Sequence, residues 1–239
     1  MISPSAPQQL SLGVLLNDDA TFANFYAADS AANAQVITAL KRQLSDDGEP
    51  LIFLWGGPGV GISHLLQAAC HNAEQQGLAV QYLPLAEMVG FAPDHLLEGM
   101  DEFDLVCLDD LHTVVGQPHW EQALFNLFNR MRDCGHRLLM GAEQGPHLLP
   151  VALADLRSRL NWGLTFQLQP MTDDEKKAAL QLRAKVRGLE LSDEVGLFIL
   201  HRAPRDLTEL FHVLDRLDSA SLAEQRRLTI PFVKQVLGL

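Results

Sequence analysis

Short apolar runs alternate with segments of helical periodicity over the N-terminal part of the chain. An unbroken apolar run such as residues 51–55 predicts a strand buried on both faces of a parallel sheet, whereas an apolar stripe of helical period predicts an amphipathic helix. This alternation indicates an α/β fold with a parallel sheet and right-handed crossovers. Strands are predicted at 51–55, 79–83, 105–108, 137–140 and 164–168, and helices at about 30–44, 63–76 and 120–134.

The pattern changes after Pro170, where strand signals nearly disappear. Residues 1–16 are also distinct, because they are rich in proline, serine and glutamine and lack a helical period, which is typical of a flexible tail. The chain is therefore predicted to comprise this tail (1–16), an α/β domain (17–168) and a small all-helical domain (169–239). Helices of the last domain are predicted at about 172–187, 193–202, 206–219 and 230–237.

Composition and charge narrow the class of protein. Hydrophobic residues make up 47% and charged residues 20% of the chain, which is the balance of a soluble globular protein. No apolar run approaches the roughly eighteen residues of a membrane span, and no basic residue precedes an apolar segment at the N-terminus. We therefore expect a cytoplasmic protein without membrane contact. The formal net charge of −12 disfavours autonomous DNA binding, because it repels a phosphate backbone.

Cysteines and histidines show no metal-binding pattern. Cys70, Cys107 and Cys134 are odd in number and form no C-x-x-C pair, which argues against a disulfide framework and against a zinc site. The nine histidines include no H-E-x-x-H sequence and no cluster with cysteine. We expect reduced thiols and no metal held by protein ligands alone.

A glycine-rich segment, Gly56 to Ser63, follows the first predicted strand and opens a helix. It matches the P-loop pattern G-x-x-x-x-G-K-[ST], except that Ile62 replaces the lysine. Glycines let backbone N–H groups wrap phosphates, the helix N-terminus adds partial positive charge, and the Ser63 hydroxyl is suited to Mg²⁺. The alternative is a plain strand-to-helix turn. The candidate phosphate-binding residues are Gly57, Pro58, Gly59, Val60, Gly61, Ile62, Ser63 and His64.

Asp109 and Asp110 end the apolar strand predicted at 105–108, where a nucleotide-binding core carries its Walker B segment. Asp109 is the candidate ligand for Mg²⁺ or its waters. The next position commonly holds a glutamate that orients the attacking water. Asp110, the candidate catalytic carboxylate, is one methylene shorter. The alternative is an acidic cap on a following helix.

The two motifs together favour nucleotide binding over hydrolysis. Ser63 and Asp109 retain the metal side of the site, whereas Ile62 removes the cation that neutralises the β- and γ-phosphates. No basic residue between Trp55 and His71 replaces that cation. Because a triphosphate carries more charge to neutralise, we expect ADP or another nucleoside diphosphate to be held at least as well as ATP, with Mg²⁺ as an optional companion.

The segment 156–165 has the sequence LRSRLNWGLT. It resembles the arginine-bearing segment of the DnaA family of bacterial replication initiators, whose ATPase part is an AAA+ core with a helical lid. In that family the second arginine reaches across a subunit interface to a neighbour's nucleotide, so the resemblance implies that Arg159 is an arginine finger acting in trans. Otherwise Arg157 and Arg159 are solvated cations at a helix end. The resemblance extends over residues 17–239.

The same resemblance assigns two sensor positions. The lid segment from Ala203 to Leu207 matches the family's G-x-R segment and implies that Arg205 lies near the nucleotide phosphates, where it would offset part of the charge lost at Ile62. The alternative is a helix-start arginine paired with the following aspartate. Glu143 matches the first sensor position, where the initiators carry a shorter aspartate.

The N-terminal tail carries a further motif that rests on resemblance to a known sequence. Gln9, Leu10, Leu12 and Val14 resemble the Q-L-x-L-x-[LF] peptide that docks on the bacterial sliding clamp of DNA polymerase III. As an extended peptide it would place its apolar side chains in a pocket while Gln9 hydrogen-bonds at the edge. The initiators continue into a helix-turn-helix domain, for which no residues remain here, so DNA contact is expected only indirectly.

By this resemblance the chain is a regulator that returns the DnaA initiator to its ADP form. It would dock on the DNA-loaded clamp and present Arg159 to the ATP held by the initiator. The resemblance also allows self-association into homo-oligomers. One alternative is an autonomous AAA+ ATPase of the helicase or clamp-loader-subunit type, which needs a replacement for the missing lysine. Another is an AAA+ relic that scaffolds replication proteins without chemistry.

Overall fold

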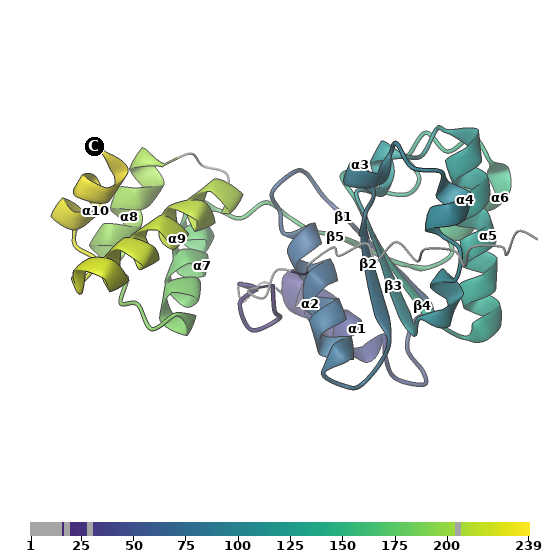
Figure 1. The fold of residues 1–239 in the computed structure, drawn as a ribbon, viewed down its shortest axis with the longest axis horizontal. Helices are drawn as coiled ribbons and strands as arrows, with labels where there is room; N and C mark the ends of the chain where they lie inside the picture. Colours follow the sequence, from purple (N-terminus) through teal and green to yellow (C-terminus); the bar gives the residue numbers. More distant parts are fainter. Residues whose placement is uncertain (1–15, 17–19, 28–30, 204–206) are drawn as a thin grey trace, which may run out of the picture.

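The computed structural model describes all residues except 1–15, 17–19, 28–30 and 204–206. Within the described residues, a five-stranded sheet forms the centre of the larger part of the protein (Figure 1). The strands occur in the order β2-β3-β4-β1-β5, and every neighbouring pair is parallel, which confirms the predicted fold class. Their bounds are β1 Leu51–Trp55, β2 Val80–Pro84, β3 Leu105–Asp109, β4 Arg137–Ala142 and β5 Leu164–Gln167.

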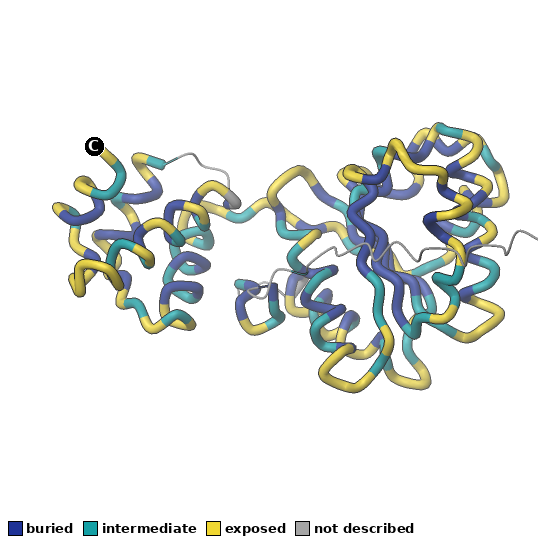
Figure 2. Tube along the Cα trace, in the orientation of Figure 1, coloured by how far each residue is buried: buried dark blue, intermediate teal, exposed yellow. Residues whose placement is uncertain are grey.

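Helices cover both faces of this sheet and make a three-layered core (Figure 1). One face is covered by α1 and α2, and the other by α5, α6 and the short helices α3 and α4. Two clusters of buried hydrophobic residues result, one on each face. Figure 2 shows the central strands coloured largely as buried. The helix bounds are α1 Ala31–Arg42, α2 Ile62–Glu74, α3 Leu85–Met88, α4 Pro93–Leu96, α5 Pro118–Cys134 and α6 Ala154–Leu160, with 3₁₀ turns at Met100–Glu102 and Leu111–Thr113.

Strand β1 lies inside the sheet. The burial of its side chains explains why an unbroken apolar run indicates a sheet that is covered on both faces. Ile52 and Leu54 belong to the cluster beneath α1 and α2, whereas Leu51 and Phe53 belong to the cluster beneath α5. All four side chains are fully buried, because successive residues of a strand face opposite sides of the sheet. The predicted strands and the three predicted helices of this part are confirmed, with bounds that differ by at most two residues.

Helices α7 to α10 form a separate bundle with its own apolar core, as predicted (Figure 1). Their starts are encoded locally. Thr172 and Glu175 form a capping box at α7, and the hydroxyls of Ser192 and Thr229 accept backbone N–H hydrogen bonds at the starts of α8 and α10. No described helix is long and apolar enough to cross a membrane. The bounds are α7 Asp173–Val186, α8 Asp193–Arg202, α9 Leu207–Glu224 and α10 Ile230–Leu237.

Helix α9 is longer than predicted, because it continues to Glu224 instead of ending near residue 219. Residues 218, 219 and 221 are aspartate and serine, which are less favourable in a helix interior than at caps and turns. Ser219 is nevertheless accommodated, since its hydroxyl donates a 3.0 Å hydrogen bond to the carbonyl of Asp215 one turn earlier. Ala220 packs against the core of the bundle. Tertiary contacts therefore extend the helix beyond its local signal.

The short helices were not predicted from the pattern. α3 and α4 each span four residues and α6 spans seven, which is too short to display a helical period. The helix α6 is nevertheless important, because it carries Arg157 and Arg159.

Candidate nucleotide site

The glycine-rich segment forms a tight turn between β1 and α2. Gly59 and Gly61 have φ angles of 74° and 99°, in the left-handed region that glycine adopts without strain. Space is also restricted at Gly61, where a Cβ atom would lie 2.8 Å from Cε2 of Phe25. No side chain caps the start of α2 at Gly61, so its first backbone N–H groups remain available to an anion.

Ile62 stands where a P-loop carries lysine, and its side chain packs against the sheet. Gly141 of β4 makes room for it, because a Cβ atom there would lie 2.5 Å from Cγ2 of Ile62 and 2.8 Å from Oδ1 of Asp109. The apolar branch therefore fills the space beside the Walker B carboxylate without adding a charge. The next residue, Ser63, is exposed and lines the same hollow as the turn.

Asp109 is held firmly at the end of β3, where it is only 2% exposed. Its Oδ2 accepts a 2.7 Å hydrogen bond from the Tyr82 hydroxyl, and its Oδ1 accepts a 3.0 Å hydrogen bond from the backbone N–H of Asp110. Burial and the Asp109 charge raise the pKa of Tyr82, which keeps its hydroxyl a donor. Tyr82 was not predicted. The strand register pairs Pro84 with Asp109, so a tyrosine two residues earlier on β2 faces the same side.

Asp110 adopts a left-handed conformation, with φ 54° and ψ 40°, which is uncommon for a residue with a side chain. Burial and the neighbouring charge of Asp109 raise the pKa of its carboxyl. Both aspartates line the hollow in front of the P-loop. Two adjacent carboxylates there suit a hard divalent cation such as Mg²⁺.

The P-loop and the helical bundle together enclose a hollow of about 390 Å³. Small-molecule sites commonly have volumes of about 300–1,000 Å³, so the space suits a ligand of nucleotide size. All the predicted phosphate-binding residues, 57–64, line this hollow together with Asp109, Asp110 and Glu143. The tertiary structure thus brings together the two motifs that the sequence predicted.

The helical bundle contributes lining residues that the sequence pattern did not predict. Arg183 of α7 is only 7% exposed and lines the hollow. Its guanidinium lies 4.4 Å from the ring centroid of Phe211 on α9, in a cation–π arrangement. His212 and Asp215 of α9 line the same wall, with Nδ1 of the histidine 3.9 Å from Oδ2 of the aspartate. No local pattern marks these residues, because α7 and α9 meet only in the folded bundle.

Carboxylates outnumber guanidinium groups in the described lining of this hollow. Asp109, Asp110, Glu143 and Asp215 face it, against Arg183. A phosphate chain and these carboxylates repel each other. A metal ion bound between them neutralises charge on both and therefore strengthens the binding of a phosphate chain here. The Ser63 hydroxyl and the Asp109 carboxylate are hard oxygen donors, which fit Mg²⁺.

His64 and Glu143 also line the hollow. Nε2 of His64 lies 2.9 Å from the carbonyl oxygen of Thr21, and its ring lies 5.7 Å from that of Phe25. The imidazole thereby ties the segment before α1 to the helix that follows the P-loop. Glu143 is exposed, with Oε1 3.8 Å from Nε2 of His112. Its carboxylate thus lies near a histidine of the 3₁₀ turn that follows β3.

Arg159 is not among the described residues that line this hollow. Its guanidinium carbon lies 5.5 Å from the ring centroid of Phe128 on α5, against which Trp162 packs edge-on at 6.2 Å. No described carboxylate forms an ion pair with it. Arg157 differs, because its Nε and Nη2 donate to the carbonyl oxygen of Val151. The guanidinium of Arg159 is therefore not engaged with the described lining of the chain's own candidate nucleotide site.

Some predicted residues lie outside the described part of the chain. They belong to the clamp-binding motif in the tail and to the sensor segment of the lid. Both assignments stay predictions. The residues are Gln9, Leu10, Leu12, Val14 and Arg205.

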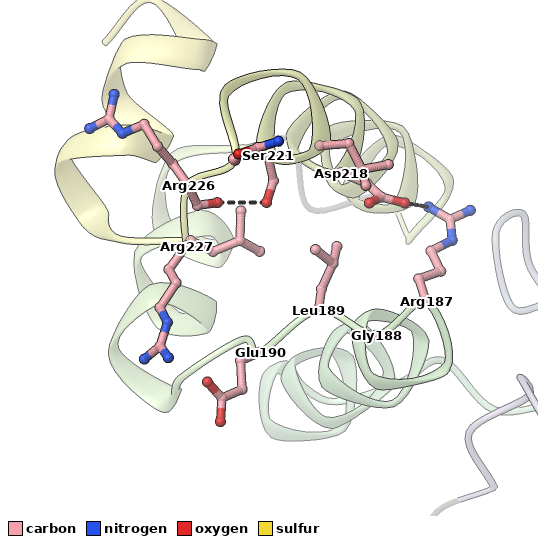
Figure 3. Close-up of a pocket in the computed structure, with 11 residues that line it drawn as sticks. Arg187, Gly188, Leu189, Glu190, Asp218, Ser221, Arg226 and Arg227 are labelled. Carbon is pink, nitrogen blue, oxygen red and sulfur yellow. Dashed lines mark hydrogen bonds and ion pairs between the residues drawn. The ribbon is translucent and has the colours of Figure 1, made fainter.

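A second hollow, of about 450 Å³, lies within the helical bundle (Figure 3). Two of the arginines that line it pair with carboxylates, Arg187 with Asp215 and Asp218, and Arg226 with Glu224. The carbonyl oxygen of Arg226 also accepts a 2.7 Å hydrogen bond from the Ser221 hydroxyl. It has no glycine-rich turn among its described residues, so the hollow at the P-loop is the candidate nucleotide site.

Two protein families match adjacent parts of the chain. Residues 16–167 match the family described as the bacterial DnaA ATPase domain, which includes every strand of the sheet and both nucleotide motifs. Residues 173–237 match the family described as the Hda lid domain, which spans α7 to α10. The first match alone covers more than half of the chain.

Solved structures of AAA+ proteins share the fold. Domain III of the replication initiation protein DnaA from Thermotoga maritima is 24% identical with a TM-score of 0.76, over 94% of this chain and 98% of that chain. AMPPCP-bound DnaA from Aquifex aeolicus is 24% identical with a TM-score of 0.70, over 84% and 65%. A RuvB variant from Thermotoga maritima is 16% identical with a TM-score of 0.66, over 91% and 73%. From the family matches, the chain belongs to the DnaA family of AAA+ proteins.

Proposed function

We propose that the protein is a negative regulator of DNA replication initiation that acts on ATP held by the DnaA initiator. It binds ADP or another nucleoside diphosphate, docks through its tail on the DNA-loaded sliding clamp, and presents Arg159 to the initiator's ATP in the cytoplasm. The placement of Arg159 carries the proposal, because this guanidinium rests on Phe128, away from its own P-loop. A guanidinium from a neighbour can neutralise charge that develops on a transferring phosphoryl group.

The protein's own site supports binding without efficient hydrolysis. The backbone cradle at Gly59 and Gly61 is intact and open to phosphates. Ile62 supplies no charge for the γ-phosphate, and Asp110 is shorter than the glutamate that commonly orients the attacking water. The nucleotide therefore acts as a structural ligand that joins the core to the lid.

Replacing Ile62 by lysine tests this account of the nucleotide preference. The Lys side chain can follow the path of Ile62 along Gly141 and still extend toward the phosphates. Because charge-assisted hydrogen bonds contribute about 1.5–3 kcal/mol, we expect Ile62→Lys to tighten ATP binding by about tenfold or more and ADP binding by less. Isothermal titration calorimetry with both nucleotides and Mg²⁺ measures the ratio. A wild-type protein that already binds ATP far more tightly than ADP contradicts the proposal.

The distribution of charge supports indirect contact with DNA. No lysine or arginine occurs between Arg42 and Arg130, although carboxylates recur throughout this stretch, and the net charge is −12. A phosphate backbone is repelled by such a surface. One similar structure is a DnaA initiator bound to AMPPCP and single-stranded DNA. For the present chain we propose that the clamp, bound through Gln9 to Val14, provides the link to DNA.

A reconstituted assay tests the proposed function. The initiator is loaded with γ-labelled ATP and mixed with the protein, the clamp and DNA, and released phosphate is measured. We expect rapid release only when all components are present, and little release when the clamp is omitted or residues 9–14 are deleted. If deletion of these residues leaves the stimulation unchanged, the proposed clamp docking is wrong.

An autonomous ATPase of the helicase or clamp-loader-subunit type is the second candidate. It is favoured by one observation: Arg183 places a positive charge in the wall of the protein's own nucleotide hollow, next to the Phe211 ring. The same assay without initiator separates the two functions. Multiple turnovers of ATP by the isolated protein support this second candidate, whereas an inert protein that stimulates the initiator supports the first.

A further inference from the structure

The helix that carries Arg159 has an unusual start. α6 is seven residues long, and its N-cap residue, Leu153, has no side chain able to cap the first N–H groups. The preceding residues, Val151 and Ala152, belong to an irregular connection from β4. A short helix without a local cap needs support from elsewhere in the fold.

Glu121, on the neighbouring helix α5, supplies this support. Its side chain is 1% exposed, and both carboxylate oxygens accept backbone hydrogen bonds. Oε1 accepts from the N–H of Gly116 at 2.8 Å, and both Oε1 and Oε2 lie 3.0 Å from the N–H of Ala152. Oε2 also accepts from the N–H of Leu153 at 2.7 Å. One buried carboxylate thus binds two chain segments that lie far apart in the sequence.

The surroundings of Glu121 stabilise its negative charge. Burial by itself raises the pKa of the carboxyl, but the N–H groups of Leu153, Ala152 and Gly116 and the charge of Arg157 outweigh it and hold the pKa below its usual value. Arg157 also donates to the carbonyl oxygen of Val151. The connection before α6 is therefore held by two charged side chains: the carboxylate of Glu121 accepts from its N–H groups, and the guanidinium of Arg157 donates to one of its carbonyl oxygens.

Helix α5 supports both ends of α6. Glu121 binds the entry to α6, and Phe128, two turns later on α5, lies beneath the guanidinium of Arg159. Leu156 and Leu160 are fully buried between these points. A shift of the helix entry would therefore be transmitted to Arg159 through a short and tightly packed element.

We propose that Glu121 is the positioning residue for Arg159, fixing through the start of α6 where the guanidinium meets the phosphoryl group of a neighbouring nucleotide. This inference rests on the proposed function. A carboxylate is required because every contact it makes is with a donor. Glutamine retains one acceptor oxygen but turns an amino group toward a backbone N–H, which forces the entry of α6 to move.

The test is the dependence of initiator ATP hydrolysis on the concentration of Glu121→Gln, in the assay with clamp and DNA. Since a displacement of about 1 Å can cost about 10²-fold in rate, we expect the maximal stimulation to fall by at least about tenfold. The concentration giving half of the maximum should change by less than about twofold. A purely structural defect would lower the active fraction and shift this concentration, leaving the maximum intact, and that result overturns the proposal.

Asp155→Asn is the matched control. It removes a carboxylate in the first turn of the same helix, but Asp155 is exposed and accepts no described backbone hydrogen bond. We expect its maximal stimulation to equal that of the wild type. An equal loss in both variants would show that charge near α6, rather than the Glu121 contacts, matters, and it would overturn the inference.

Further measurements separate this inference from the proposed function. If Arg159→Ala keeps full stimulation, the proposed function fails whatever Glu121→Gln does. If only Glu121→Gln keeps it, the inference alone fails. Amide hydrogen exchange of Glu121→Gln should be faster over residues 152–160 and unchanged in β1 and β3, and unchanged exchange in 152–160 contradicts the geometry. Should Glu121→Gln not fold, Arg157→Gln loosens the same connection from its exposed side and must lower the maximum.

Discussion

Replacement of Arg159 by alanine is expected to abolish the stimulation of initiator ATP hydrolysis while leaving the fold and clamp binding unchanged. The guanidinium rests on Phe128 and has no described carboxylate partner, so its removal breaks no ion pair within the described chain. Arginine fingers contribute about 10³- to 10⁵-fold to phosphoryl transfer, so a loss of that order should reduce the rate to that of the initiator alone. Single-turnover release of labelled phosphate, together with clamp binding by surface plasmon resonance, measures both quantities.

Two further variants identify the cause of such a loss. Arg159→Lys keeps the charge but not the planar fork of N–H donors, and we expect it to restore only a small part of the rate. Arg132→Ala removes an exposed arginine from α5 that pairs with Asp133, and it should behave like the wild type. A normal rate with Arg159→Ala, or an equal loss with Arg132→Ala, contradicts the arginine-finger proposal.

Replacement of Gly61 by alanine is expected to remove nucleotide binding. The φ angle of 99° costs a residue with a side chain about 1–2 kcal/mol, and the new Cβ atom would lie 2.8 Å from the Phe25 ring. The turn must then move, which withdraws backbone N–H groups from the phosphates. Since each hydrogen bond to a charged group contributes about 1.5–3 kcal/mol, the loss of two weakens ADP binding by about 10²-fold or more. Isothermal titration calorimetry with ADP and Mg²⁺ measures this change.

Gly90→Ala is the control for that prediction. Gly90 lies between α3 and α4, and a Cβ atom there would have no heavy atom within 4 Å. We expect unchanged ADP affinity for this variant. Unchanged affinity for Gly61→Ala as well would show that the backbone cradle does not hold the phosphates, and the account of the nucleotide site would then be wrong.

The sequence by itself determined the fold class and the two nucleotide motifs. Helix and strand periodicities are local properties, so β1 and α5 could be located from the order of apolar residues alone. The P-loop and Asp109 were found in the same way, because each is a contiguous segment at the end of a predicted strand. Strand order and short elements such as α6 were not accessible, since neither leaves a period in the sequence.

Only the tertiary structure decided what surrounds those motifs. Tyr82 reaches Asp109 because β2 lies beside β3, and Arg183 reaches the nucleotide hollow because α7 and α9 pack together in the lid. Cys70 and Cys107 are 37 residues apart in the chain, yet their sulfur atoms lie 3.4 Å apart. From the sequence alone, Glu121 is an ordinary surface position of α5. In the structure, the connection between β4 and α6 covers it and donates backbone hydrogen bonds to its carboxylate. Such contacts depend on how distant segments meet, and no local pattern of residues encodes that geometry.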